Sequence, residues 1–277
     1  MQLSFVKMQG LGNDFVVLDG RGKTLARDMV KLSQHLCDRR LGIGADQLLI
    51  LKESAIADFT MLIYNADGSQ VQMCGNGIRC LARYIQEQGL SDKTELVIET
   101  HAGIIKPRLI GDEVEVDMGE PVLEAGKIPV DLSGLVIDHL LPVADKTFPV
   151  TCVSMGNPHC VIFVENVRDF PVTRYGSLIE NHPLFPQRTN VEFIEIINEH
   201  ELKMRVWERG SGETPACGTG ACASVVASVL RGKTQRKVTV NLPGGPLFIH
   251  WSKQDNRVYM RGPAVTVFSG QIEVSVG

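Results

Sequence analysis

Short runs in which apolar and polar residues alternate recur along the chain and indicate a protein built largely of β-strands. Such alternation is the pattern of a strand that buries one face. Clear examples are "TELVIET" (94–100), "EVEVDM" (113–118), "KVTVNL" (237–242) and "RVYMRG" (257–262). A further alternating run, "AVTVFSGQIEVSVG" (264–277), closes the chain and predicts a last strand.

Three segments have helical patterns. Two of them, "ARDMVKLSQHLCDR" (26–39) and "GIRCLARYIQEQG" (77–89), lie in the first half of the chain, and the second of these ends at Gly89, a residue suited to a helix C-terminus. The third, "GACASVVASVLRG" (220–232), carries small apolar residues on every face. A helix that is apolar all round is buried, so we expect this one in a core.

The two halves of the chain repeat one another at a nearly constant offset. Gly12-Asn13 and Gly156-Asn157 each precede an apolar run and lie 144 residues apart. Four further pairs lie 143 residues apart: Gln47 and Asn190, Asn65 and Glu208, Cys74 and Cys217, and Gly119 and Gly262. Ordered matches at one offset predict an internal duplication.

The duplication and the predicted elements together favour an α+β fold of two pseudo-symmetric domains. Each domain is expected to be a curved, mostly antiparallel β-sheet or barrel wrapped around a central helix, with the active site in the inter-domain cleft. The expected limits are residues 1–118 plus 263–277 for the first domain and 119–262 for the second. The final strand is expected to complete the first domain's sheet and to correspond to "VLEAGKIPV" (122–130) in the second half.

Two cysteines occupy the same place in the two halves, directly before a predicted helix: Cys74 in "MCGNG" and Cys217 in "ACGTG". A helix N-terminus has N–H groups without partners and a partial positive charge, which favour both a thiolate and a bound carboxylate. Two thiols on opposite sides of one ligand could remove a proton from a carbon and return a proton to its other face, one acting as base and the other as acid. The pattern therefore predicts inversion of a carbon centre.

Polar residues at the repeat positions suit a zwitterionic ligand. Amide side chains can bind both carboxylate and ammonium groups, Arg209 could clamp a carboxylate, and Glu208 could hold an ammonium group. The repeat is broken here, because Glu208-Arg209 matches Asn65-Ala66, and a ligand with a second charged end would explain the difference. The amides are Asn13, Gln47, Asn65, Asn157 and Asn190.

Composition narrows the classes of function. The formal net charge of −4 provides no basic field for nucleic acid or for an anionic membrane surface. No apolar run approaches the ~20 residues of a membrane span, and the start has no secretory pattern, so a cytoplasmic protein is expected. Seven cysteines without a C-x-x-C pair predict free thiols, not a disulfide framework or a zinc site.

Four motifs together resemble those of the bacterial diaminopimelate epimerases: "GLGNDF", "MCGNGIRC", "MGNPH" and "ERGSGETPACGTGACA". The resemblance extends over nearly the whole chain. Proline racemases typically have histidine after the first "CG", where this chain has Asn76, and phenazine-biosynthesis isomerases share the fold but lack the cysteine pair. The resemblance implies a homodimeric isomerase that interconverts LL- and meso-diaminopimelate for lysine and peptidoglycan synthesis, without pyridoxal phosphate, metal or other cofactor.

The resemblance also implies roles for individual residues. With the LL isomer, Cys217 would accept the α-proton and Cys74 would donate one, while His159 and Glu208 would tune the ionisation of the thiols. Phe268 stands where some relatives have a tyrosine at a dimer contact. The reacting carboxylate would be bound by Gly75, Asn76, Gly218 and Thr219, and the remainder of the substrate by Asn13, Gln47, Asn65, Asn157, Asn190, Glu208 and Arg209.

The other five cysteines, Cys37, Cys80, Cys152, Cys160 and Cys222, lie outside the catalytic motifs, and Cys80 and Cys222 are expected to face the core. Three alternatives stay open at this point. The chain could be a related amino-acid racemase, a thiol-redox sensor in which Cys74 and Cys217 form a disulfide, or an amino-acid binding module without catalysis. Exchange of an α-proton with solvent separates the enzymes from the other two classes.

Overall fold

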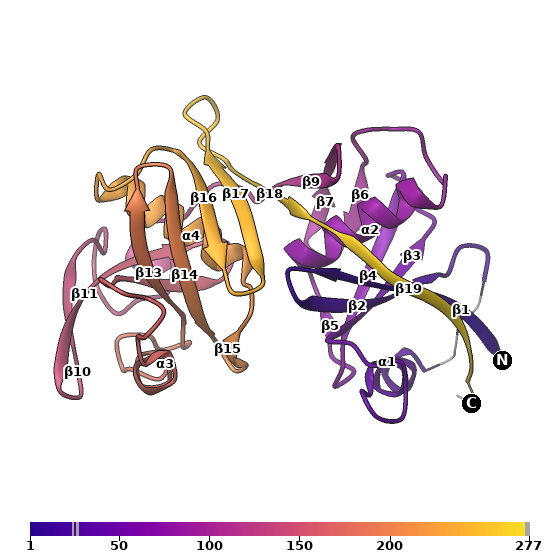
Figure 1. Cartoon of the computed structure of the whole chain (residues 1–277), viewed down its shortest axis with the longest axis horizontal. Coiled ribbons are helices and arrows are strands. Elements are labelled where there is room, and N and C mark those ends of the chain that lie inside the picture. Colours follow the sequence, from indigo (N-terminus) through magenta and orange to yellow (C-terminus); the bar gives the residue numbers. More distant parts are fainter. Residues whose placement is uncertain (24, 26–27, 275–277) are drawn as a thin grey trace. The chain divides into compact units, whose positions relative to one another are not determined.

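A computed structural model describes residues 1–23, 25 and 28–274, and the chain divides into two compact units. The first unit comprises Met1–Val116 and the C-terminal segment from Gly262, and the second comprises Asp117–Arg261. Each unit combines one large mixed sheet with helices, as Figure 1 shows, which confirms the predicted α+β class. Each unit is described below by itself.

The sheet of the first unit runs in the order β19-β1-β2-β3-β4-β6-β7, with β5 paired to β4, and a hairpin of β8 and β9 follows. The elements of the first unit are β1 (Gln2–Gly10), β2 (Asn13–Asp19), α1 (Met29–Cys37), β3 (Gln47–Lys52), β4 (Phe59–Asn65), β5 (Gln70–Val71), α2 (Gly75–Glu87), β6 (Ile98–Thr100), β7 (Gly103–Ile105), β8 (Arg108–Ile110), β9 (Glu113–Asp117) and β19 (Val265–Glu273).

The sheet of the second unit runs in the order β10-β11-β12-β13-β14-β16-β17-β18, with β15 paired to β14. Its elements are η1 (Ala125–Lys127), β10 (His139–Val143), β11 (Lys146–Ser154), β12 (Pro158–Phe163), α3 (Val172–Glu180), β13 (Asn190–Asn198), β14 (Glu201–Glu208), β15 (Gly212–Thr214), α4 (Gly218–Leu230), β16 (Lys237–Leu242), β17 (Gly245–Trp251) and β18 (Val258–Pro263).

The two units repeat the same strand pairings. β2 pairs parallel with β3 and β3 antiparallel with β4, just as β12 pairs parallel with β13 and β13 antiparallel with β14. The parallel pairs β4–β6 and β14–β16 also correspond, and a helix precedes β6 and β16 alike. The predicted duplication is therefore present in the topology. Both sheets have two ends along these paths in the described residues, so neither is the closed barrel that was one of the expected forms.

Each sheet curves around one helix. In the first unit α2 packs against β1, β2, β3, β8 and β19, and in the second α4 packs against β11–β14, β16 and β17. Residues Gly220–Ser228 of α4 are all buried, as its apolar sequence predicted. The helix α2 ends at Glu87, and Gly89 follows with a left-handed φ of 62°, which confirms its predicted place at the helix end.

A second helix covers the other face of each sheet. The apolar side of α1 packs on Val16, Leu48 and Ile50 in one core, and α3 packs on a core that includes Val191 and Phe193. Strands β3 and β13 are thus covered on both faces, which explains why residues 48–51 and 190–194 are buried without interruption. The side chains of β3 and β13 that lie between the core residues point to the opposite face, toward α2 and α4.

Several sequence-based expectations need correction. The helix α3 was not predicted, because its sequence opens with β-branched residues and contains Gly176; the glycine is needed where the helix meets Trp207, since a Cβ there would lie 2.5 Å from Trp207 Cβ. The segment 94–100 is a strand only over Ile98–Thr100. The first predicted helix begins at Met29, and its expected residues 26 and 27 lie outside the described residues.

The final strand completes the first sheet. β19 pairs antiparallel with β1 from Gln9 back to Gln2, and Figure 1 shows the two running side by side. Its place next to β1 corresponds to that of β10 next to β11. The expected counterpart at 122–130 was wrong, because that segment folds around the short η1 turn.

Candidate active site

Cys74 is the N-cap residue of α2, directly before its first turn. It has extended backbone angles, and its Sγ accepts a hydrogen bond from the N–H of Gly77 at 3.4 Å, as an N-cap side chain does. Its Sγ also lies 3.8 Å from Asn13 Oδ1 and is the donor in that contact. Asn13 Oδ1 accepts a second hydrogen bond from Asn76 Nδ2 at 3.2 Å. The structure therefore brings together Cys74, Asn13 and Asn76, three of the residues singled out from the sequence.

The Asn13 side chain is held from behind by charged residues that sequence reasoning did not assign to the site. Asn13 Nδ2 donates to Asp46 Oδ2 at 2.9 Å, and Arg39 binds both Asp46 and Asp14 at 2.7 Å. Burial works against ionisation of Asp14, but hydrogen bonds from Arg39 and Lys7 hold its pKa well below its usual range. The amide of Asn13 is thus fixed with its oxygen toward the thiol.

Gln47 and Asn65 form a second polar group in the first unit. Gln47 begins β3, Asn65 ends β4, and the two are cross-strand partners, so their side chains meet: Gln47 Nε2 donates to Asn65 Oδ1 at 2.8 Å. Gln47 Oε1 and Asn76 Oδ1 are buried and have no hydrogen-bond partner among the described residues. Buried acceptors without a partner are suited to a ligand that carries an ammonium group.

Cys217 begins α4 in the same way that Cys74 begins α2. Its Sγ accepts from the N–H of Gly220 at 3.4 Å and lies 3.5 Å from Thr219 Oγ1. Cys217 is only 5% exposed, whereas Cys74 is partly exposed. The two thiols therefore share a local geometry but differ in burial.

The surroundings of Cys217 favour the thiol form. Burial raises the pKa of Cys217 well above its ordinary value, and the carboxylates of Glu208 and Glu192 raise it further; hydrogen bonds from Thr219 and Gly220 act in the opposite direction. The sequence alone predicted that the helix N-terminus would favour a thiolate, so burial outweighs that effect here.

Glu208 shares this buried environment. Burial raises its pKa, and hydrogen bonds from Thr214 and Cys217 together with the nearby His159 lower it less than burial raises it. Thr214 Oγ1 donates to Glu208 Oε1 at 2.5 Å. The carboxyl of Glu208 is therefore next to the Cys217 thiol. The family resemblance implied that Glu208 tunes the ionisation of the thiols.

His159 lies at the start of β12 and is fully buried. Its Nδ1 lies 2.7 Å from Glu192 Oε1, and its Nε2 lies 3.0 Å from Asn157 Oδ1. Asn157 Nδ2 in turn donates to Thr219 Oγ1 at 3.3 Å. Glu192 was not found from the sequence, because in "NVEFI" it reads as the polar residue of an alternating strand; only the burial of β13 on both faces places it inside.

Asn190 and Arg209 lie together where β13 begins and β14 ends. Asn190 Oδ1 accepts from the backbone N–H of Arg209 at 2.9 Å, and Arg209 Nη1 donates to Gln187 O at 3.1 Å. The buried Glu180 accepts from the N–H of Gly210 at 2.8 Å and so holds the turn that follows. Gly75 and Gly218 are the first residues of α2 and α4, two residues before the starts of the helical segments 77–89 and 220–232 that the sequence predicted.

The remaining five cysteines are buried and form no disulfide bond, as predicted from the sequence. Burial raises the pKa of Cys37 and of Cys80 to about 12, so both remain thiols at neutral pH. Phe268 on β19 is 47% exposed and its ring meets Phe5 edge to face, with centroids 5.8 Å apart. The exposed ring lies on β19, the strand at one end of the first sheet's path, and is far from Cys74 in the sequence.

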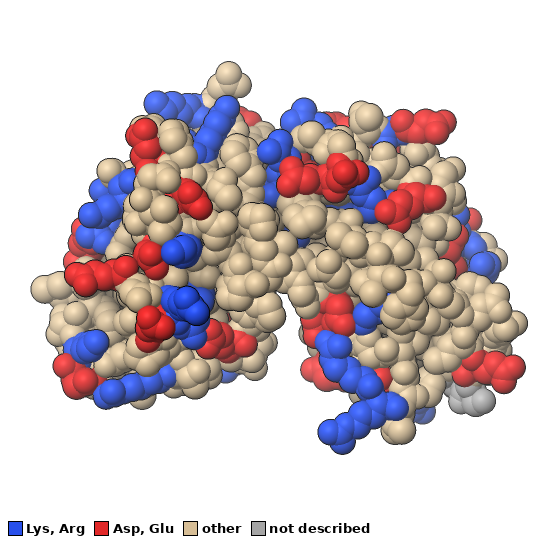
Figure 2. Space-filling view, in the orientation of Figure 1, with Lys and Arg blue, Asp and Glu red and all other residues tan. Residues whose placement is uncertain are grey.

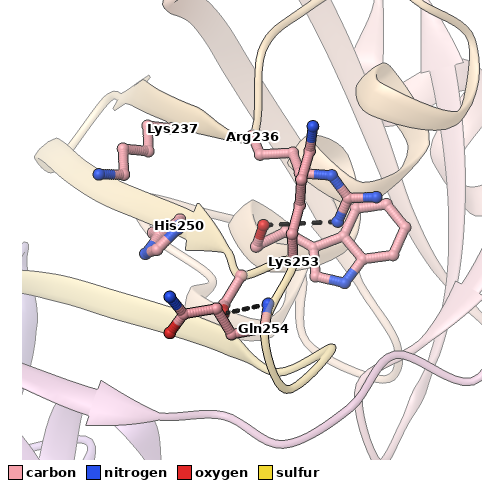
Figure 3. A pocket seen from close by; sticks show the side chains of 7 residues that line it. Arg236, Lys237, His250, Lys253 and Gln254 are labelled. Atoms are coloured by element: carbon pink, nitrogen blue, oxygen red, sulfur yellow. Dashed lines mark hydrogen bonds between the residues drawn. The ribbon is translucent and has the colours of Figure 1, made fainter.

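Charged side chains and a hollow lie on the surface outside the two thiol regions. Figure 2 shows acidic and basic side chains interspersed on the visible face of each unit. A hollow of about 340 Å³ in the second unit is lined by residues around the start of β16 and the end of β17, among them Arg236, His250 and Lys253. None of the candidate site residues lines it (Figure 3). Within the described ranges, no helix has the length and apolarity needed to cross a membrane, and no group of three or more potential metal ligands is found.

Comparisons with known proteins agree on a family. A model of the family described as "Diaminopimelate epimerase" matches residues 5–124 and 151–267. The chain is 56% identical over 274 residues to the diaminopimelate epimerase of Moorella thermoacetica, covering 97% of this chain and 98% of that protein. It is 54% identical over 280 residues to the diaminopimelate epimerase of a Synechocystis species, covering 99% of this chain and 100% of that protein.

Solved structures share the fold at low identity. A phenazine biosynthesis protein of the PhzF family from Bacillus anthracis matches with a TM-score of 0.72 at 16% identity, covering 99% of this chain and 100% of that one. A hydroxyproline epimerase from Agrobacterium vitis with bound trans-4-hydroxy-L-proline matches with a TM-score of 0.70 at 15% identity, covering 98% of this chain and 92% of that one. By the extent and identity of the sequence matches, the chain belongs to the diaminopimelate epimerase family.

Proposed function

We propose that this protein converts LL-2,6-diaminopimelate into the meso isomer, with Cys217 and Cys74 acting on one α-carbon. The observation that carries the proposal is the duplication of a cysteine N-cap: each thiol begins the central helix of its unit and accepts an N–H three residues on. With the LL isomer, the Cys217 thiolate takes the α-proton and the Cys74 thiol gives a proton to the opposite face. After one turnover Cys217 is a thiol and Cys74 a thiolate.

The contacts of Cys74 support its role as the proton donor. Its Sγ lies 3.8 Å from Asn13 Oδ1, an acceptor that a thiol can bind and that would repel a thiolate. The orientation of that amide is fixed by hydrogen bonds to Asp46 and Asn76. The first unit is therefore arranged to hold a protonated sulfur.

The contacts of Cys217 support its role as the base. Burial raises the pKa of Cys217 and of Glu208, and a group with a raised pKa is a stronger proton acceptor once it is ionised. Because Glu208 lies next to the thiol, it can receive the Cys217 proton and so generate the thiolate. His159, which lowers the pKa of Glu208, would tune this exchange.

The helix starts provide the carboxylate site. In α2 the N–H groups of Gly77 and Ile78 are occupied by Cys74, which leaves those of Gly75 and Asn76 without intrahelical acceptors. In α4 the N–H groups of Gly218 and Thr219 are left in the same way. Backbone N–H groups at a helix N-terminus bind carboxylates and stabilise the negative charge that develops when the α-proton leaves.

The polar residues that differ between the units would hold the unreactive end of the substrate. Diaminopimelate carries a second ammonium and a second carboxylate, which suit Glu208 and Arg209, while Asn65 has only neutral groups to offer. We assign Asn13, Gln47, Asn65, Asn157 and Asn190 to the same ligand. The two compact units would be the two domains of this enzyme, within residues 1–118 plus 263–277 and 119–262.

We further propose that the enzyme is a cytoplasmic homodimer. Phe268, Val265 and Val267 are each about half exposed on β19, and β19 ends the sheet path of the first unit. Apolar side chains on an open sheet edge favour association with a second chain. The biosynthetic reaction uses a small soluble amino acid, which suits a cytoplasmic enzyme.

The test is solvent exchange at the α-carbon across a small panel of amino acids. Incubation with LL-diaminopimelate in heavy water should give deuterium at the α-carbon and the meso isomer, and the Cys74→Ala and Cys217→Ala variants should each lose nearly all turnover. Proline, lysine and glutamate serve as control substrates and should not exchange. Absence of label with fully reduced protein, or faster exchange of a control amino acid, would contradict the proposal.

A further inference from the structure

The two units differ sharply in what lies behind the thiol. In the first unit Phe15 and Leu49 face the first turn of α2: a Cβ on Gly77 would meet Leu49 Cδ2 at 3.2 Å and Phe15 Cε1 at 3.4 Å. In the second unit the same strand positions carry His159 and Glu192. A Cβ on Gly220 would meet Glu192 Oε1 at 2.7 Å and Cys217 Sγ at 3.3 Å.

The strand registers show that these positions are equivalent. Leu49 is the partner of Val17 in the parallel pair β2–β3, and Glu192 is the partner of Val161 in the parallel pair β12–β13. Each of the two lies two residues after the polar residue that opens its strand, Gln47 or Asn190. The duplicated fold has thus placed an ionisable pair where the other copy has an apolar pair.

A continuous chain of polar contacts links this pair to the thiol. Glu192 Oε1 lies 2.7 Å from His159 Nδ1, and His159 Nε2 lies 3.0 Å from Asn157 Oδ1. Asn157 Nδ2 lies 3.3 Å from Thr219 Oγ1, which lies 3.5 Å from Cys217 Sγ. The side chains of Glu192 and His159 are both 0% exposed, so the contact between them is inaccessible to solvent.

A buried carboxylate is costly and stays in a core only with partners that compensate for lost hydration. The partners of Glu192 are His159 on β12 and the first turn of α4, whose partial positive charge faces Oε1 at Gly220. Glu192 Oε2 has no hydrogen-bond partner in the described part of the chain. An apolar residue would fill this space at lower cost, as Leu49 does in the first unit, so the acid calls for a role beyond packing.

We propose that Glu192 is a positioning residue for the Cys217 half of the reaction. It accepts a hydrogen bond from His159 Nδ1–H, which fixes the ring, and the ring acts through Asn157 and Thr219 on the Cys217 sulfur. The titratable groups around this pair are Cys217, Glu208 and the buried Cys160. The pair makes the two thiols chemically different although their helix starts are alike. This inference rests on the proposed epimerase function.

The position of the imidazole proton is the first test and needs no substrate. Long-range ¹H–¹⁵N spectra of protein labelled with [¹⁵N]histidine distinguish the two neutral tautomers from imidazolium, and loss of one of the seven histidine signals in His159→Phe assigns His159. In the intact protein Nδ1 should carry a proton, because it faces the Glu192 carboxylate at 2.7 Å. In Glu192→Leu the remaining side-chain partner is the Asn157 acceptor at Nε2, so the ring should shift to the Nε2–H tautomer.

A kinetic cycle is the second test. Glu192→Leu should lower kcat for LL-diaminopimelate by about 10- to 100-fold, less than the complete loss of an acid–base group, with KM nearly unchanged. In the His159→Phe background the same change should have an effect below about twofold, because Glu192 acts through His159. The double variant reproduces the Phe15–Leu49 pair of the first unit, so its folding has a precedent in the same chain. Glu192→Gln, which keeps an acceptor oxygen, should retain more activity than Glu192→Leu.

Glu195→Gln is the matched control. Glu195 lies on the same strand but binds Val167 N and Lys203, and its loss should leave kcat and the His159 spectrum unchanged. A ring that carries its proton on Nε2 alone in the intact protein would overturn the proposal, as would equal kinetic losses from Glu192→Leu with and without His159. Because the tautomer is read without substrate, a failure of the epimerase assignment would show separately, as absence of α-proton exchange in the unmodified protein.

Discussion

Replacing Gly220 with alanine places one methyl group between the start of α4 and Glu192. The added Cβ would lie 2.7 Å from Glu192 Oε1 and 3.3 Å from both Glu192 Cδ and Cys217 Sγ. The carboxylate cannot swing into solvent, because the Glu192 side chain is 0% exposed and is hydrogen-bonded to His159. The methyl group must therefore displace the carboxylate, the sulfur or both.

The size of the effect follows from these distances. Oε1 must retreat by about 0.6 Å to reach an ordinary C···O separation of about 3.3 Å. Overpacking a core costs about 1–3 kcal/mol, and alanine is better than glycine in a helix by about 1 kcal/mol, so the free energy of unfolding should fall by about 0–2 kcal/mol. At roughly 2–4 °C per kcal/mol the melting temperature drops by less than about 8 °C. A misplacement approaching 1 Å at a reacting group costs up to about 100-fold, so kcat should fall far more than stability does.

Gly77→Ala is the matched control, because it makes the same change at the start of α2. There the new Cβ meets a Leu49 methyl group at 3.2 Å, and Cys74 Cβ and the Phe15 ring edge at 3.4 Å. The closest of these contacts is apolar and is relieved by a small shift of the Leu49 side chain. We expect a smaller loss of kcat than in Gly220→Ala, with both variants compared by initial rates and thermal melting. Wild-type kcat in Gly220→Ala would show that the Glu192 carboxylate is not held against α4 and would refute the reasoning.

Three further predictions follow from the burial of His159, Glu192 and Cys217 and from the exposure of Phe268. His159→Phe removes the hydrogen-bonding partner of the buried Glu192 carboxylate and should lower the free energy of unfolding by about 3–5 kcal/mol, most of which Glu192→Leu should restore. A double variant as unstable as the single one in urea melts would contradict this. Burial raises the pKa of Cys217, so the folded thiol keeps its proton above about pH 8.5, where the unfolded thiol loses it, and the free energy of unfolding should fall as pH rises past that value. Cys217→Ala should reduce this fall, and an unchanged slope would exclude Cys217 as a contributor. Phe268→Asp should shift the protein toward monomer in size-exclusion chromatography with light scattering, and an unchanged mass would place Phe268 outside the interface.

Much of the fold follows from features that are local in the sequence. Cys74 and Cys217 were expected directly before helices, and both are N-caps. The burial of α4 followed from small apolar residues on all its faces. The helix α3 escaped prediction because its stability comes from packing Gly176 on Trp207, a contact between residues distant in the sequence.

The site was predictable where repeat positions and motifs coincide. All four of the following residues were candidates from the sequence, and the structure brings them together in pairs: Asn13 with Cys74, and Asn157 with Thr219. Glu192 could not be predicted from the sequence, because a glutamate in an alternating strand is expected to face solvent. Its burial depends on α3 and α4, which cover the two faces of β13. The high pKa of Cys217 was missed for the same reason, since the helix N-terminus is a local feature and desolvation is not.

The central claim is that two thiols act on opposite faces of one α-carbon, and the early course of the reaction in heavy water tests it most directly. Isomers are separated at low conversion of LL-diaminopimelate, and the deuterium at the α-carbon of each is measured by mass spectrometry. If the base and the acid are two different thiols, the meso product should carry solvent deuterium while the recovered LL substrate remains protiated. Meso product that retains the substrate's own hydrogen, or equal early labelling of recovered LL substrate and product, would contradict the two-thiol account.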